Sequence, residues 1–142
     1  MNIRSTRPAA LLIAGILLGA GGMRWLAAED EPVRRRVVLE TDLADLPGQQ
    51  AVLFDVVLAP GASTGRHFHH GQEIAFVIEG TGTLLMDGHE PLTMKAGDAV
   101  TVPPRMVHEG KNAGDAPLRL CAIQIVEKGK PLVVPVEEAP KK

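Results

Sequence analysis

Short apolar runs, separated by clusters of Gly, Pro, Asp and Asn, recur at intervals of about ten residues from Val33 onward. No window of this region keeps the apolar spacing of a helix for long. The runs that we expect to be strands are Arg36–Glu40, Ala51–Ala59, Ile74–Glu79, Thr83–Met86, Ala99–Val102 and Leu118–Val126. Evenly spaced short strands predict an all-β fold, either a sandwich or a barrel.

The connections between these runs carry turn residues. Asp87-Gly88, between two apolar segments, predicts a two-residue hairpin turn. The segment Asp42–Gly48 predicts a loop or a single helical turn. The Pro-rich, charged stretch Pro135–Lys142 is expected to fray, and residues 137–142 are expected to lie beyond the folded domain. We therefore place one domain at residues 33–136 of this chain of 142 residues.

Residues 1–28 differ in character from the rest. Arg4 and Arg7 precede an unbroken apolar run, residues 9–23, that is shorter than the roughly 20 residues of a membrane span. A basic start before such a run is typical of a secretory signal peptide, and the alternative is an uncleaved N-terminal membrane anchor. Either reading predicts a domain that is periplasmic or secreted, or anchored to the inner membrane and facing the periplasm. We expect contact with the membrane only if residues 1–28 are not cleaved, and then only through that segment.

Charge and composition argue against nucleic acid as a partner. Loss of residues 1–28 would remove three of the 15 basic residues and none of the 17 acidic ones, which leaves an acidic domain. Nucleic-acid binding needs a basic surface. The remaining Arg34-Arg35-Arg36 run is expected to be a solvated or edge-strand charge cluster. Cys121 is the only cysteine, so no internal disulfide bond can form.

The stretch GASTGRHFHHGQEIAFVIEG, residues 61–80, concentrates side chains that bind metals. His67 and His69 are two residues apart, so on a strand they project from the same face. Glu73 follows Gly71, which permits a turn that brings the carboxylate back to that face. A fourth ligand must come from a distant strand, and His108, which follows two prolines, is the best candidate.

These residues resemble the two sequence motifs of the cupins. The first motif, G-x5-H-x-H-x3-E-x6-G, is matched by Gly61, His67, His69, Glu73 and Gly80. The second, G-x5-P-x-G-x2-H-x3-N, is matched by Gly97, Pro103, His108 and Asn112, with Arg105 in place of its internal glycine. This departure falls on a turn and not on a ligand, so it affects the backbone shape expected there.

The resemblance implies a double-stranded β-helix, the jelly-roll barrel of the cupins, with one divalent metal ion held by His67, His69, Glu73 and His108. Imidazole and carboxylate donors without a thiolate suit a transition metal (Fe, Mn, Ni, Co, Cu or Zn) better than Ca or Mg. Four protein ligands would leave two positions of a six-coordinate ion for water, oxygen or a small-molecule ligand.

Alternation along the strands predicts which residues near the metal ligands face the interior. Met106 has the parity of His108 and is a candidate for the substrate pocket. Arg105 is either a clamp for an anionic substrate or a surface charge. On the last long strand Gln124 should face the interior, where it could hydrogen-bond a metal-bound ligand. His70 should turn away from the metal.

The leading interpretation is a metal-dependent oxygenase that acts on a small oxygenated or aromatic molecule, with Glu73 as a metal ligand and, in a second role, a catalytic base. The alternative is a non-catalytic periplasmic module that binds a small molecule or a metal. A third possibility, an isomerase or epimerase, would need a second acid or base, and the chain has no Tyr. Edge strands and the resemblance together predict a homodimer.

Overall fold

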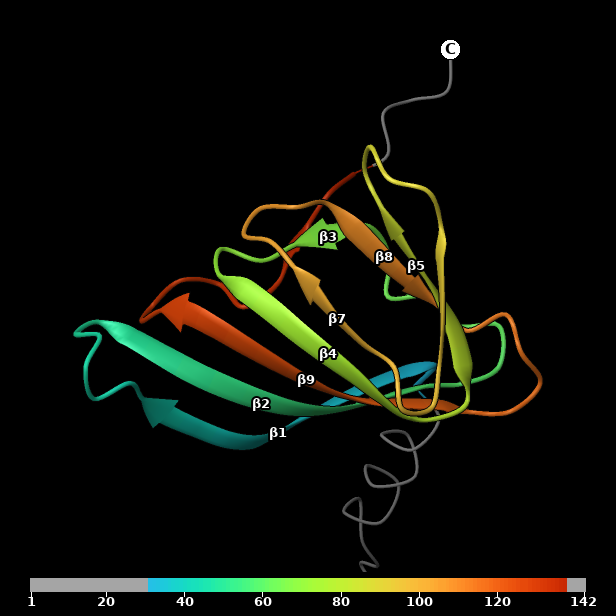
Figure 1. Ribbon diagram of the computed structural model, residues 1–142, viewed down its shortest axis with the longest axis horizontal. Coiled ribbons are helices and arrows are strands. Elements are labelled where there is room, and N and C mark those ends of the chain that lie inside the picture. Colours follow the sequence, from blue (N-terminus) through green and yellow to red (C-terminus); the bar gives the residue numbers. More distant parts are fainter. Residues whose placement is uncertain (1–30, 138–142) are drawn as a thin grey trace, which may run out of the picture. The chain divides into compact units, whose positions relative to one another are not determined.

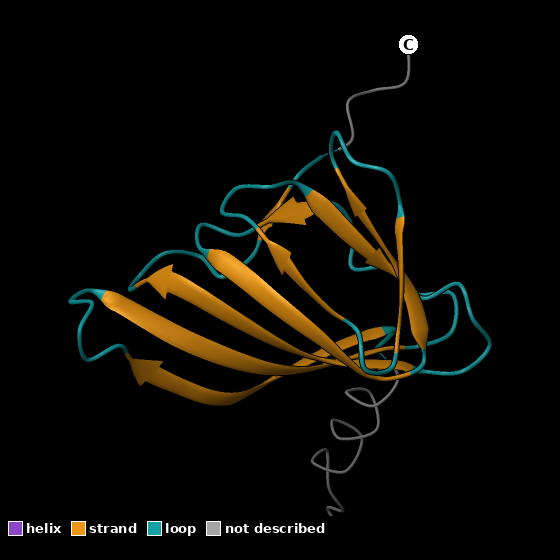
Figure 2. Ribbon diagram, in the orientation of Figure 1, coloured by secondary structure: helices purple, strands orange, loops and turns teal. Residues whose placement is uncertain are grey.

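The computed structural model describes residues 31–137, and these residues form strands connected by loops (Figure 1). The strands are β1 (Val33–Asp42), β2 (Gln49–Leu58), β3 (His67–Phe68), β4 (Gln72–Glu79), β5 (Thr81–Met86), β6 (Leu92–Lys95), β7 (Ala99–Val102), β8 (His108–Lys111), β9 (Leu118–Glu127) and β10 (Val134–Pro135). Figure 2 shows no helix in this part of the chain. Within residues 31–137, accordingly, no helix is long and apolar enough to cross a membrane.

Two antiparallel sheets make up the fold. The first sheet has the strand order β1-β2-β9-β4-β7, and the second has the order β10-β3-β8-β5-β6. In Figure 1 the second sheet lies across one face of the first, toward the β4 and β7 side. Several neighbours in each sheet are distant in sequence, such as β2 and β9 or β3 and β8, which is the crossover pattern of a double-stranded β-helix. The predicted all-β fold is therefore confirmed.

Alternation along β2 shows how the sequence builds the core. Every second side chain of this strand, from Gln50 to Leu58, is buried, while those between are half-buried. A strand exposes alternate residues to opposite faces, so this pattern fixes which face packs inward. The main cluster of the buried core comprises Val52, Phe54, Val56, Leu58, Ala62, Val77, Met94, Leu118 and Ala122.

All six predicted runs are strands, and four further short strands lie outside these runs. β3, β6, β8 and β10 have between two and four residues each, too few for an apolar period to be visible. The predicted turn at Asp87-Gly88 is present, since the His89 amide donates to the Met86 carbonyl at 3.0 Å and the φ of Gly88 is +75°. The pairing of the flanking strands is shorter than a two-residue hairpin implies. β5 and β6 do pair, yet their last paired residues are Leu84 and Leu92. Leu85 and Met86 pair with β8 instead, so the connection is longer than two residues.

The C-terminal segment is more ordered than predicted. Val134 and Pro135 form β10, which pairs with β3, and the Val136 amide donates to the Arg66 carbonyl at 3.0 Å. Fraying from Pro135 onward is therefore wrong. A two-residue strand that contains a proline carries too little pattern to be recognised in sequence. The predicted leader at residues 1–28 and the end of the tail, residues 138–142, lie outside the described residues.

Strand β1 is an edge of the first sheet, as expected of the arginine cluster that it contains. Three consecutive apolar residues of this strand, Val37, Val38 and Leu39, are each about half exposed, at 49%, 50% and 54%. Exposed apolar edges favour association between chains. The homodimer stays a prediction.

Candidate metal centre

Three histidines converge inside the barrel. His67, His69 and His108 are all buried, at 5%, 3% and 4% exposure, and one ring nitrogen from each lies within 4.8 Å of the others. Their ring centroids are 4.3 to 4.9 Å apart. Groups this close would repel one another if all three were protonated. The spacing instead fits three neutral imidazoles that share one cation.

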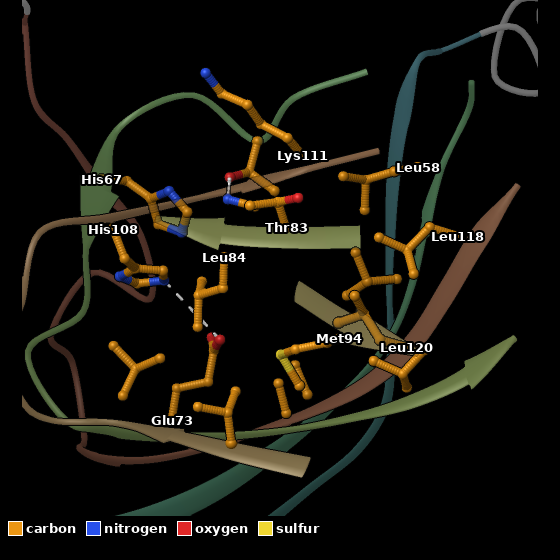
Figure 3. Close-up of a pocket in the computed structure, with 18 of the residues that line it drawn as sticks. Leu58, His67, Glu73, Thr83, Leu84, Met94, His108, Lys111, Leu118 and Leu120 are labelled. Atoms are coloured by element: carbon orange, nitrogen blue, oxygen red, sulfur yellow. Dashed lines mark hydrogen bonds and ion pairs between the residues drawn. The ribbon is translucent and has the colours of Figure 1, made fainter. Parts of the chain in front are cut away.

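The second sheet positions these rings. His67 on β3 and His108 on β8 are direct cross-strand neighbours, which places their side chains on the same face. His69 lies two residues after His67 and returns to that face. His108 is the first residue of β8, as its place after the prolines predicts. Figure 3 shows His67 and His108 side by side at one end of the cavity, with Glu73 facing them from the first sheet.

Backbone carbonyls orient all three rings. Nδ1 of His67 lies 2.8 Å from the Gly65 oxygen, Nδ1 of His69 lies 2.6 Å from the Leu132 oxygen, and Nδ1 of His108 lies 2.9 Å from the Met106 oxygen. A carbonyl only accepts, so each Nδ1 carries the proton and donates. Each neutral ring then leaves its Nε2 lone pair free. This is how proteins orient histidine ligands toward a metal.

Glu73 on β4 brings a carboxylate to the same place. Its Oε2 lies 2.8 Å from Nε2 of His69, and its Oε1 lies 4.0 Å from Nε2 of His108. Because Nδ1 of His69 already donates to Leu132, a neutral His69 would present a lone pair to the carboxylate. Two acceptor atoms at 2.8 Å need a proton or a cation between them. The contact therefore requires positive charge at this pair, supplied either by a second proton on His69 or by a metal ion.

Gln124 lies directly opposite Glu73 across the β4–β9 pair and is 3% exposed. Its Nε2 donates to Oε2 of Glu73 at 3.2 Å, so it holds the carboxylate in place. Its Oε1 is buried and has no hydrogen-bond partner among the described residues. A buried acceptor without a donor is costly. A water or ligand donor on a bound ion would satisfy it, so the donor set and this orphaned oxygen both fit a metal centre.

Burial and local charge set the protonation of the cluster. Burial lowers the pKa of His67 to about 4, against a smaller opposing effect of its hydrogen bond to Gly65. Burial likewise lowers the pKa of His108. For Glu73, burial raises the pKa, but the hydrogen bond from His69 and the nearby His69 and His108 rings together lower it below its usual value. His67 and His108 are therefore neutral, and Glu73 ionised, at neutral pH.

Acidification should destabilise the metal-free protein. Because His67 has a pKa of about 4 when folded and 6.5 when unfolded, the unfolded state binds more protons between these values. Stability therefore falls as the pH drops from 6.5 toward 4, by about 1–2 kcal/mol between pH 7 and pH 5. Urea unfolding of chelator-treated protein measures this loss. His67→Gln should show a shallower pH dependence; an identical slope in the variant would contradict the assignment.

An apolar cavity adjoins the cluster. Its volume is about 90 Å³, room for several water molecules or a small organic molecule. His67, Glu73 and His108 form one end, and Figure 3 shows Leu58, Leu118 and Leu120 at the other. The Lys111 side chain, although it belongs to the lining, runs away from the cavity in Figure 3. The chemistry of the cavity is therefore concentrated at the histidine end.

Small residues beside Glu73 create this space. Ala75 on β4 and Ala122 on β9 are direct cross-strand neighbours, and both line the cavity. Their methyl groups leave unfilled the volume that larger core residues would occupy. Alternation from Glu73 and Gln124 places these alanines on the same interior face, a signal that the sequence contains.

The other predicted site residues are separate from the cavity. Gln124 is interior, as alternation predicts, but it lies against Glu73 and is not part of the cavity lining. Met106 is half-buried and does not line the cavity. Arg105 is exposed, which favours the surface-charge alternative. Contact of any of these three residues with a substrate stays a prediction. His70 turns away from the cluster, with its ring against Phe68.

Arg105 occupies a backbone position that suits glycine. Its φ is +63°, and it is the only described residue other than glycine with a positive φ. Its amide donates to the His69 carbonyl at 2.8 Å, which ties this turn to the ligand-bearing segment. A side chain in the left-handed region costs about 1 kcal/mol. The turn therefore keeps the shape that glycine would favour, although an arginine stands there.

Comparison with known proteins gives one family. A family model described as "Cupin domain" matches residues 54–134, more than half of the chain, including all four proposed ligands. An uncharacterised protein of Methanocaldococcus jannaschii is 31% identical over 74 residues, which are 51% of this chain and 58% of that protein. The chain thus spans little more than half the length of this relative.

Solved structures agree with the family match. A cupin-like protein from Thermotoga maritima is 34% identical, with a TM-score of 0.55, over 65% of this chain and 67% of that one. A conserved protein with a double-stranded β-helix domain from Klebsiella pneumoniae is 27% identical, with a TM-score of 0.59, over 77% of this chain and 88% of that one. Both likenesses support the strand arrangement described above.

Proposed function

This chain belongs to the cupin family, and from that premise we propose that it is a metal-dependent oxygenase acting on a small molecule. In this proposal His67, His69, His108 and Glu73 hold one divalent transition-metal ion. The contact of 2.8 Å between Nε2 of His69 and Oε2 of Glu73 carries the proposal, because a cation between these atoms makes it favourable. The three inward-facing Nε2 atoms support the same site.

In this proposal each residue around the metal site has a distinct role. The carbonyls of Gly65, Leu132 and Met106 hold the imidazoles in one tautomer. Gln124 steadies Glu73, whose carboxylate can also accept a proton from a bound substrate. The apolar walls exclude water from the space beside the ligands. When bound, the ion supplies Lewis-acid or redox chemistry at its open positions.

The lining of the cavity favours chemistry that depends on the ion. Apart from the metal ligands, its titratable side chains are those of Arg35 and Lys111. Neither is suited to exchange protons near neutral pH. An isomerase or epimerase would need a second acid or base there, whereas an oxygenase would not. Because the cavity lining offers so few acid or base side chains, a non-catalytic binding module is the alternative function.

Oxygen uptake distinguishes these two functions. The protein would be stripped with a chelator, reloaded with Fe(II), Mn or Zn, and tested with a panel of small aromatic and oxygenated compounds in an oxygen-electrode cell. We expect substrate-dependent uptake with Fe(II) or Mn and none with Zn, which is not redox-active. Binding of panel compounds without uptake or product under any metal would favour the binding module.

A further inference from the structure

The cationic side chain of Arg35 borders the cavity and has no assigned role. The sequence predicts that Arg34-Arg35-Arg36 forms an edge-strand charge cluster, and β1 is such an edge. Arg34 and Arg36 fit that prediction: both are exposed, and Arg36 pairs with Asp55 at 3.2 Å. Arg35 differs from them, because it belongs to the cavity lining.

The register of the sheet explains the difference. Arg35 pairs with Val56, Val56 with Leu120, and Leu120 with Val77. All members of this cross-strand row line the cavity, so Arg35 ends a row that forms its floor. Since β1 is the outermost strand and Arg35 is also exposed, this residue stands where the cavity meets solvent. Arg34, one residue earlier, pairs with Val57 on the opposite face.

No ion pair or side-chain hydrogen bond to the guanidinium of Arg35 occurs within residues 31–137. The cavity walls around it are mainly aliphatic. Burial lowers the pKa of Arg35, and the charge of Glu73 raises it by a smaller amount. A partly desolvated cation that faces an apolar cavity favours an anion as its partner.

We propose that Arg35 anchors the carboxylate of the ligand, so that the cavity takes small monocarboxylic acids with an apolar body. The carboxylate lies against Arg35 at the mouth, and the apolar body lies along the row formed by Val56, Leu120 and Val77. This inference rests on the proposed function only in placing the far end of the ligand near the histidines. A single unpaired guanidinium balances one negative charge, which favours a carboxylate over a phosphate dianion.

Calorimetric titration with benzoate and butyrate, each beside its neutral amide, tests this proposal on the full chain, both stripped of metal and loaded with Zn. We expect wild type to bind an acid about tenfold or more tightly than its amide. Arg35→Gln should remove that preference and leave amide binding unchanged. Arg34→Gln is the matched control, because it removes the same charge one residue away on the outer face and should keep the preference.

The proposal would be overturned if neither acid bound to wild type or if phenyl phosphate bound more tightly than benzoate. It would also be overturned if Arg35→Gln kept the preference for the acid, or if Arg34→Gln lost that preference to the same extent. Thermal unfolding should show both variants folded, since both residues are exposed. Elemental analysis of the same samples separates this inference from the proposed function. Arg35-dependent benzoate binding in a protein that takes up no metal would refute the metal centre and retain the carboxylate site.

Discussion

His69→Ala should abolish stoichiometric metal binding. The variant removes one of three inward-facing Nε2 donors and the ring that contacts Glu73 at 2.8 Å. It also frees the Leu132 carbonyl, which holds that ring in its tautomer. We expect affinity to fall by more than about 100-fold, beyond the range typical of changes outside the ligand set. Elemental mass spectrometry after loading with Fe(II), Mn or Zn and dialysis measures the loss.

His70→Ala provides the matched control for this experiment. His70 is the next residue along the chain, but its ring lies against Phe68 and away from the cluster. The control should retain about one ion per chain, as wild type does. Equal metal content in His69→Ala and wild type would contradict the ligand assignment, and loss in both variants would point to a general effect of histidine removal in this segment.

Gly71→Ala should destabilise the protein strongly. A Cβ added at residue 71 would overlap the carbonyl oxygen of Ile125 and come within 2.8 Å of the Val126 Cα. Both obstacles are backbone atoms of β9, so no side-chain rotation relieves them. The strands must separate, at a cost of about 3 kcal/mol or more. Because Gly71 lies between His69 and Glu73, the same shift should weaken metal binding.

Urea unfolding of the metal-free protein measures the free energy of unfolding of Gly71→Ala without a contribution from metal binding. Gly110→Ala serves as the control, since a Cβ there would meet only the Thr64 side chain, at an ordinary contact distance of 3.5 Å. That variant should differ from wild type by less than about 0.5 kcal/mol. A Gly71→Ala protein as stable as Gly110→Ala would show that the approach of β9 to residue 71 is looser than described.

Part of the candidate metal centre could be predicted because the spacing of His67 and His69 is local information. His67 and His69 share a strand face, and Glu73 faces them from β4 in the other sheet. The role of Gly71 was only partly anticipated. Its φ is not in the left-handed region; the residue must be glycine because β9 passes close to it. Such an approach depends on the pairing of β4 with β9, which one segment of sequence does not specify.

Arg35 shows why the rest of the site could not be predicted. In sequence it is the middle of three arginines, with nothing to distinguish it from Arg34 or Arg36. Only the register against β2 assigns it to the face that lines the cavity, and a slip of one residue would have turned it to the outer face and Arg34 or Arg36 inward. The pairing of the short strands β3 and β8 could not be predicted from local sequence either. It brings His67 and His108 together across a long stretch of chain.

Anomalous diffraction from crystals of the metal-loaded protein tests the central claim most directly. Data collected above and below the absorption edge of the added metal locate the ion. The account predicts one anomalous peak about 2.0–2.3 Å from Nε2 of His67, His69 and His108, with a Glu73 oxygen in contact. A peak elsewhere, coordination through Nδ1, or no peak at the three histidines would contradict it.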